Sequence, residues 1–213
     1  MTPPPLPARI VRHAHLLSPP RRAYAMAMPV PIARSDWTVA EVNELPDDGN
    51  RYEVLDGELL VSPAPTWLHQ RAVRELVELL LPYVKTIGLE LFFAPTAVTW
   101  GPRTELQPDV LAVPRLEGRP AQRFEDVGVL SLAVEVLSPS TARQDRYKKR
   151  PEFQRRAVPE YWIVDPASRL VERWRPNDEE PEVLLDCLVW QPSAEVAPLT
   201  INLSRYFRAI HGD

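Results

Sequence analysis

The sequence predicts an α/β fold in which helices cover a sheet. The first indication is the stretch VLSLAVEVLSPST at residues 129–141, where apolar residues occupy both sides of a strand, as in a strand that is covered on both faces. The second is a helical pattern in residues 62–88, with apolar residues at every fourth position. These positions are Leu68, Ala72, Leu76, Leu80 and Val84. We therefore expect this helix to pack on the sheet.

The chain has 213 residues, which suits one domain that buries about 70% of its unfolded surface. Residues 1–34 contain eight prolines, five arginines and no acid. We predict that they form a disordered Pro/Arg-rich extension and that residues 35–213 form a single domain. Met26 and Met28 offer alternative starts of translation.

The formal net charge of −4 is unevenly distributed, because the body without the extension has 20 basic and 29 acidic residues. Such a body does not favour nonspecific DNA binding through bulk charge. The single cysteine, Cys187, is expected to be a small buried hydrophobe, and a lone cysteine suits a reducing cytoplasm. No apolar run approaches the roughly 18 residues that span a bilayer, so we expect a soluble cytoplasmic protein.

The first elements are predicted from caps and turns. Ser35 or Asp36 is expected to cap a short helix. The strands RYEVL and ELLVS flank Asp56-Gly57, a dipeptide that tolerates positive φ and suits a hairpin. Thr66 is the expected N-cap of the long helix, and Gly88 lies just past its end.

Strands and one further helix make up the rest. Three apolar segments follow the long helix: LFFAPTAVTW, PDVLAV and VLSLAVEVL. A second helix, at about residues 142–157, precedes the predicted strands YWIVD, LVERW and EVLLDCLVW. No glycine-rich phosphate loop is visible, which argues against NTP or NAD chemistry.

Two acids occupy strands that should not carry charge. Glu135 is surrounded by apolar residues, and Asp109 opens the short apolar strand of QPDVLAV. A lone carboxylate out of water costs several kcal/mol, so it must be protonated, paired or bound to a cation. Either acid alone could equally cap a loop or pair with an arginine. Together they favour a site for Mg²⁺, which prefers carboxylate oxygens.

The second helix supplies a lysine. Thr141, Asp145, Lys149 and Phe153 are spaced by four, and the apolar Phe153 indicates that their shared face is turned inward. We therefore expect Lys149 to point toward the body, with Asp145 one turn away. Residues 143–156 include seven basic and two acidic residues. Phosphate steering and an ordinary charged helix face explain this excess equally well.

Six ordered motifs carry a family resemblance. They are LPDDGNRYEVLDGEL, SPAPTWLHQ, QPDVLAV, VEVLSPST, DRYKKR and VPEYWIVDP. With them the chain resembles the Uma2 group of endonucleases, within the PD-(D/E)xK nuclease superfamily, from about Ser35 to Phe207. The resemblance implies a mixed sheet flanked by helices with a restriction endonuclease-like core.

The resemblance also implies site residues. It makes Asp109 the PD aspartate, Glu135 the strand glutamate and Lys149 the catalytic lysine, supplied here by the following helix. Glu53 matches a further acidic position, either a third metal ligand, a group behind the ligands or a surface hairpin residue. His69 matches the histidine of the family's SPxPxxxHQ motif, for which we favour a structural role at the helix start.

Four positions depart from the family pattern. Leu137 stands where the superfamily commonly has its lysine, and Phe153 replaces a tyrosine. Pro151 is expected to kink the second helix or begin a new turn, because it lacks an N–H. Ala157 replaces a glycine, so a left-handed helix stop would strain it.

The sequence thus predicts metal-dependent hydrolysis of DNA phosphodiester bonds. Mg²⁺ or Mn²⁺ would be held by Asp109 and Glu135, with Glu53 as a third candidate, while Lys149 acts beside them. A homodimer is expected, because nucleases of this fold often pair to cut two strands. Two alternatives are a nuclease-like fold kept as a binding or assembly module without catalysis, and a metal phosphoesterase acting on RNA or small substrates.

Overall fold

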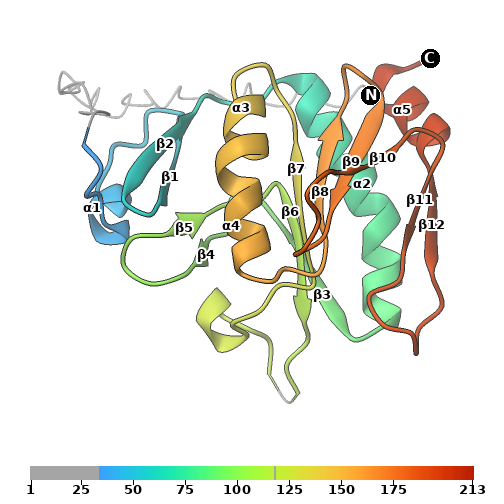
Figure 1. Ribbon diagram of the computed structural model, residues 1–213, viewed down its shortest axis with the longest axis horizontal. Coiled ribbons are helices and arrows are strands. Elements are labelled where there is room, and N and C mark those ends of the chain that lie inside the picture. Colours follow the sequence, from blue (N-terminus) through green and yellow to red (C-terminus); the bar gives the residue numbers. More distant parts are fainter. Residues whose placement is uncertain (1–33, 118) are drawn as a thin grey trace, which may run out of the picture. The chain divides into compact units, whose positions relative to one another are not determined.

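Helices flank both faces of a six-stranded mixed sheet (Figure 1). The computed structural model describes residues 34–117 and 119–213, which belong to one compact unit, Pro31–Asp213. The strand order is β10-β9-β8-β7-β6-β3, in which β7 and β8 pair in parallel and the other neighbours are antiparallel. The strands are β3 (Leu89–Phe93), β6 (Val110–Pro114), β7 (Leu132–Val136), β8 (Tyr161–Asp165), β9 (Leu170–Trp174) and β10 (Glu182–Leu184). The mixed sheet that the resemblance implied is confirmed.

Two smaller sheets and several helices complete this unit. One sheet has the order β2-β1-β5-β4 and consists of β1 (Arg51–Leu55), β2 (Glu58–Ser62), β4 (Val98–Thr99) and β5 (Glu105–Leu106). The other is a hairpin of β11 (Cys187–Trp190) and β12 (Leu199–Asn202). The helices are α1 (Val39–Asn43), α2 (Trp67–Thr86), α3 (Ala142–Gln144), α4 (Arg150–Arg155) and α5 (Leu203–His211). A 3₁₀ turn covers Phe124–Asp126, and a π-helical segment, Asp145–Lys149, joins α3 to α4.

Side chains of the central strands point alternately to the two faces of the sheet, and each face belongs to a separate hydrophobic core. In β7, Leu132, Val134 and Val136 pack in one core with α2 and α5, while Ala133 packs in the other core. That second core includes Phe153 of α4 and residues of the small four-stranded sheet. Because successive side chains of a strand point to opposite faces, Glu135 shares the face of Ala133, toward α3 and α4.

Several local predictions are confirmed. Asp56 and Gly57 both have positive φ (50° and 87°) in the turn of the β1–β2 hairpin. Thr66 caps α2 by accepting a hydrogen bond from the His69 N–H. Pro151 lies in the first turn of α4, directly after the π-helical segment, so it begins a new turn. Ala157 ends the helical region with a φ of 53°, the left-handed conformation that a glycine would adopt more easily.

Three expectations were wrong. The cap of α1 is Thr38, which forms a capping box with Glu41, and not Ser35 or Asp36. The single strand expected over residues 182–190 is divided, because the chain leaves the six-stranded sheet after β10 and pairs with β12 through β11. Cys187 is exposed, because β11 is half of a hairpin and turns only alternate residues, Leu188 and Trp190, to the core.

The extension predicted for residues 1–34 lies, except for Arg34, outside the described residues. Within the described part, no helix has both the length and the apolar character needed to cross a membrane.

Candidate active site

The strand register places the two predicted acids side by side. Strands β6 and β7 pair antiparallel with Val110 opposite Val134. One residue further along, Asp109 comes to lie opposite Glu135, on the face turned toward α3 and α4. The Asp109 carboxylate also accepts a hydrogen bond of 2.8 Å from the Val136 N–H, which fixes it against β7.

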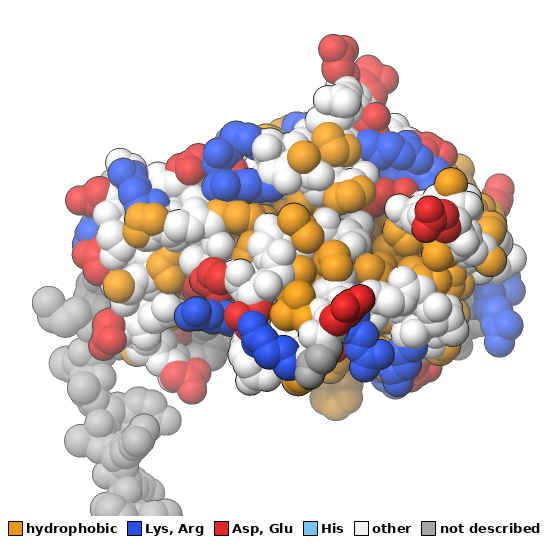
Figure 2. Space-filling model, turned by 90° about the horizontal axis from the view of Figure 1, so that it is seen from below, with side chains coloured by type: hydrophobic (Ala, Val, Ile, Leu, Met, Phe, Trp, Pro, Cys, Tyr) orange, Lys and Arg blue, Asp and Glu red, His pale blue; other side chains and the backbone are white. Residues whose placement is uncertain are grey.

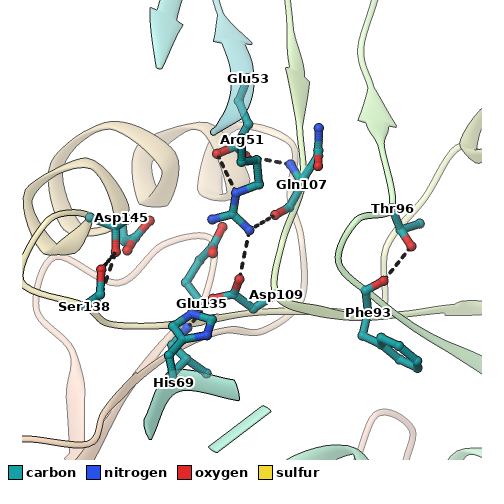
Figure 3. Close-up of polar contacts among 12 residues, drawn as sticks. Arg51, Glu53, His69, Phe93, Thr96, Gln107, Asp109, Glu135, Ser138 and Asp145 are labelled. Carbon is teal, nitrogen blue, oxygen red and sulfur yellow. Dashed lines mark hydrogen bonds and ion pairs between the residues drawn. The ribbon is translucent and has the colours of Figure 1, made fainter. Parts of the chain in front are cut away.

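Lys149 lies among three carboxylates (Figure 3 shows their surroundings). Its Nζ atom is 2.8 Å from Glu53 Oε2, 3.1 Å from Glu135 Oε1 and 3.7 Å from Asp145 Oδ1. The lysine side chain is 1% exposed, so the inward orientation predicted from the helix stripe is confirmed. Glu53 is equally buried, which excludes the interpretation of it as a surface hairpin residue.

Arg51 and His69 hold Asp109 from the other side (Figure 3). Arg51 donates from Nη1 to Asp109 Oδ1 at 2.9 Å, and its Nε is 3.6 Å from Glu53 Oε2. The Nε2 atom of His69 is 3.0 Å from Asp109 Oδ2. His69 therefore contacts the acid cluster in addition to standing in the first turn of α2.

Burial and neighbouring charges shift the pKa values of this cluster in opposite directions. Burial raises the pKa of Glu135 well above its ordinary value despite the attraction of Lys149, and it raises the pKa of Asp145 to about 6. Burial acts in the same sense on Asp109, but the hydrogen bond and charge of His69 and the charge of Arg51 outweigh it and lower the pKa of that acid. Burial lowers the pKa of Lys149, but the negative charges of Glu135, Glu53 and Asp145 outweigh this effect and raise it above its ordinary value. This lysine therefore stays protonated.

The cluster has an excess of buried negative charge. Four buried carboxylates (Glu53, Asp109, Glu135 and Asp145) face two side-chain cations, Arg51 and Lys149, which leaves two negative charges when all are ionised and His69 is neutral. Glu135 Oε2 is buried and accepts no hydrogen bond. Isolated buried charge is costly, and a hard divalent cation is one way to compensate it.

The donor set fits Mg²⁺ or Mn²⁺ by its chemistry. Both ions prefer carboxylate oxygens, and Mg²⁺ is often held by one or two protein carboxylates with water and substrate phosphate. In residues 34–117 and 119–213, no three His, Cys, Asp or Glu side chains are arranged as a complete metal site. In this arrangement the ammonium of Lys149 and the guanidinium of Arg51 lie against the same acids, so a cation would need them to shift.

A cavity of about 650 Å³ leads to this cluster. Arg51, His69 and Asp109 line it, together with residues of the loops before α2 and after β7. Asp109 is thus the acid of the cluster that borders a space large enough for a small molecule or part of a polymer chain.

Most of the basic residues of the second helical region are paired with acids of the chain. Arg146 pairs with Glu172 and Asp165, and Lys148 pairs with Glu58. Arg155 and Arg156 both pair with Glu152. Five of the seven basic residues of this stretch thus pair with acids, which favours an ordinary charged helix face over a surface for phosphate steering.

Sequence analysis missed Arg51. A single arginine at the start of a hairpin strand carries no signal of burial, and its role as the cation beside Asp109 follows from a contact across 58 residues of sequence. Its position two residues before Glu53, on the same face of β1, was the one available hint.

The fold and the cluster define a class of protein, an α/β protein of nuclease-like fold with a buried acid–lysine centre. The chain belongs to the Uma2 family, described as "Putative restriction endonuclease", whose family model matches residues 39–204. Among solved structures, a putative nuclease belonging to DUF820 from Anabaena variabilis ATCC 29413 has a similar fold, with a TM-score of 0.66 and 22% identity. The match covers 82% of this chain and 99% of that chain. The curated proteins searched include no match to this chain. The family supports a nuclease role, and the solved structure shows that the fold is shared.

Proposed function

We propose that this protein is a metal-dependent endonuclease that hydrolyses DNA phosphodiester bonds. The observation that carries the proposal is the convergence of Asp109, Glu135 and Lys149, from three different parts of the chain, beside a cavity that Asp109 lines. Burial of several acids around one lysine, with shifted pKa values, is typical of functional sites.

Each residue has a proposed task. Asp109 and Glu135, with Glu53 as a third ligand, would hold Mg²⁺ or Mn²⁺, which polarises the phosphate and lowers the pKa of the attacking water. Lys149 orients that water or offsets negative charge on the phosphate oxygens. Asp145 and His69 are positioning residues, since Asp145 orients the Lys149 ammonium and His69 orients the Asp109 carboxylate. A homodimer, which would allow both strands to be cut, is part of the same proposal.

One observation favours the alternative of a nuclease-like module without catalysis. Lys149 and Arg51 already pair with the carboxylates that a metal ion would use. A module of this kind needs no divalent ion, whereas the proposed enzyme must bind one.

Calorimetric titration with Mn²⁺ separates the two functions. We expect the wild-type protein to bind Mn²⁺, and we expect Asp109→Asn and Glu135→Gln to lower the affinity by at least about 100-fold, because metal affinity falls about 10- to 100-fold even when only a supporting partner of a ligand is lost. Glu58→Gln is the matched control, since Glu58 is an exposed acid that pairs with Lys148. Absence of Mn²⁺ binding by the wild type would favour the module.

Activity is tested with the same variants. In Mg²⁺ or Mn²⁺, the wild type and Glu58→Gln should cut DNA, assayed on circular single-stranded DNA and on supercoiled plasmid, and Asp109→Asn should cut neither. Nicking that persists unchanged in folded Asp109→Asn would refute the assignment of this site.

A further inference from the structure

The candidate acids lie too deep for a rigid double helix. The side chain of Asp109 is 3% exposed, and those of Glu135 and Lys149 are 1% exposed. Access runs through the cavity of about 650 Å³, a volume typical of sites for small molecules. A DNA duplex, whose major groove alone is about 12 Å wide, cannot enter such a space. A single strand can, because it bends freely and exposes each phosphate in turn.

The walls of the cavity suit bases better than a row of phosphates. The lining includes apolar residues, with Leu45 and several prolines, and amide side chains such as Asn43, Asn50 and Gln107. Unpaired bases offer an apolar π-face and hydrogen-bonding edges, which match walls of this kind. Arg51 is the one Lys or Arg side chain among the described residues that line the cavity.

Among the described residues, several cations outside the cavity are already paired within the chain. Four of the basic residues in and near α4 pair with acids, as described above for Arg146, Lys148, Arg155 and Arg156. On the face shown in Figure 2, basic side chains alternate with acidic ones around an apolar middle, so this face has no continuous band of positive charge. Duplex binding draws much of its affinity from many phosphate contacts, and neither these four paired residues nor the face in Figure 2 supplies a row of free cations for them.

An exposed tryptophan directly follows a cavity-lining residue in the chain. Trp67 is the first residue of α2 and lies between Thr66 and His69, which both line the cavity. It is 88% exposed, the highest value among the large hydrophobic residues that the structure describes. Phe93, which is 54% exposed, directly precedes the lining residues Ala94 and Pro95. Exposed aromatic rings beside a groove are the platforms on which proteins stack the bases of single strands.

We propose that the substrate is DNA in which the strand to be cut is unpaired, and that Trp67 stacks on one of its bases at the cavity mouth. This inference rests on the proposed function, since it takes the acid cluster as the place of cleavage. The bases enter along the apolar and amide-bearing walls, and Arg51 is the side-chain cation available to a phosphate there.

Fluorescence anisotropy with end-labelled oligonucleotides in Ca²⁺ tests the binding part on the full chain. We expect an oligo-dT strand to bind at least about tenfold more tightly than a duplex, and Trp67→Ala to weaken this binding by about 5- to 100-fold, the usual effect of losing a stacked base. Trp67→Phe should keep most of the affinity. Tyr147→Ala is the matched control, because Tyr147 is also an exposed aromatic (70%) but has no cavity-lining residue beside it in the chain, and it should change nothing.

The outcomes separate this inference from the proposed function. Equal or tighter binding of the duplex, or full affinity in Trp67→Ala, would overturn the inference even if the protein cuts DNA. Oligo-U bound as tightly as oligo-dT would overturn the choice of DNA. Conversely, tight Trp67-dependent binding of oligo-dT without any cleavage in Mg²⁺ or Mn²⁺ would overturn the proposed function and leave the binding preference standing.

Discussion

Replacing Lys149 by methionine should strongly destabilise the protein. Methionine keeps most of the volume of the side chain, so the main loss is the positive charge that faces Glu53, Glu135 and Asp145 at 2.8–3.7 Å. Because this group of side chains is 1% exposed or less, water cannot take over the role of the ammonium. Breaking a buried ion pair on one side costs about 3–5 kcal/mol.

This loss is large enough to be measured by thermal or chemical unfolding. For a domain of this size, about 1 kcal/mol corresponds to a shift of roughly 2–4 °C, so we expect the Tm of Lys149→Met to fall by about 6–20 °C. Lys148→Met is the matched control, because its partner Glu58 is exposed and such pairs contribute about 0–1 kcal/mol.

A second substitution identifies the cause of the loss. Adding Glu135→Gln to Lys149→Met removes one of the unpaired buried charges, so it should restore part of the lost stability. The explanation would be refuted if Lys149→Met were no less stable than Lys148→Met, or if Glu135→Gln made the double variant still less stable.

Two further predictions concern the backbone and pH. Ala157→Gly should raise the free energy of unfolding by about 0.5–1 kcal/mol in a urea titration, because Ala157 adopts a φ of 53° that glycine tolerates without strain; a lower midpoint would contradict this. The hydrogen bond from Arg34, followed by those from Thr38, lowers the pKa of Glu41 from 4.5 to about 2. Its stabilising effect is therefore present above pH 4.5 and lost as the pH falls toward 2. Over this interval the Tm of the wild type should fall more than that of Glu41→Gln, and equal slopes would exclude the effect.

Local chemistry allowed parts of the fold to be predicted from short stretches of sequence. The Asp56-Gly57 turn, the Thr66 cap and the new turn at Pro151 each depend on the conformational limits of one or two residues. The exposed position of Cys187 was missed because an apolar segment does not show whether its strand joins a sheet covered on both faces or a hairpin with one exposed side.

For the candidate site, the sequence by itself determined that Asp109 and Glu135 lie in apolar strands and that Lys149 turns inward, since strand and helix periodicity fix which face a side chain occupies. Only the tertiary structure decided which groups meet there. The β6–β7 register sets Asp109 beside Glu135, and the packing of β1 and α2 adds Arg51, Glu53 and His69. These contacts join residues far apart in the chain, and no local pattern encodes a distance between elements.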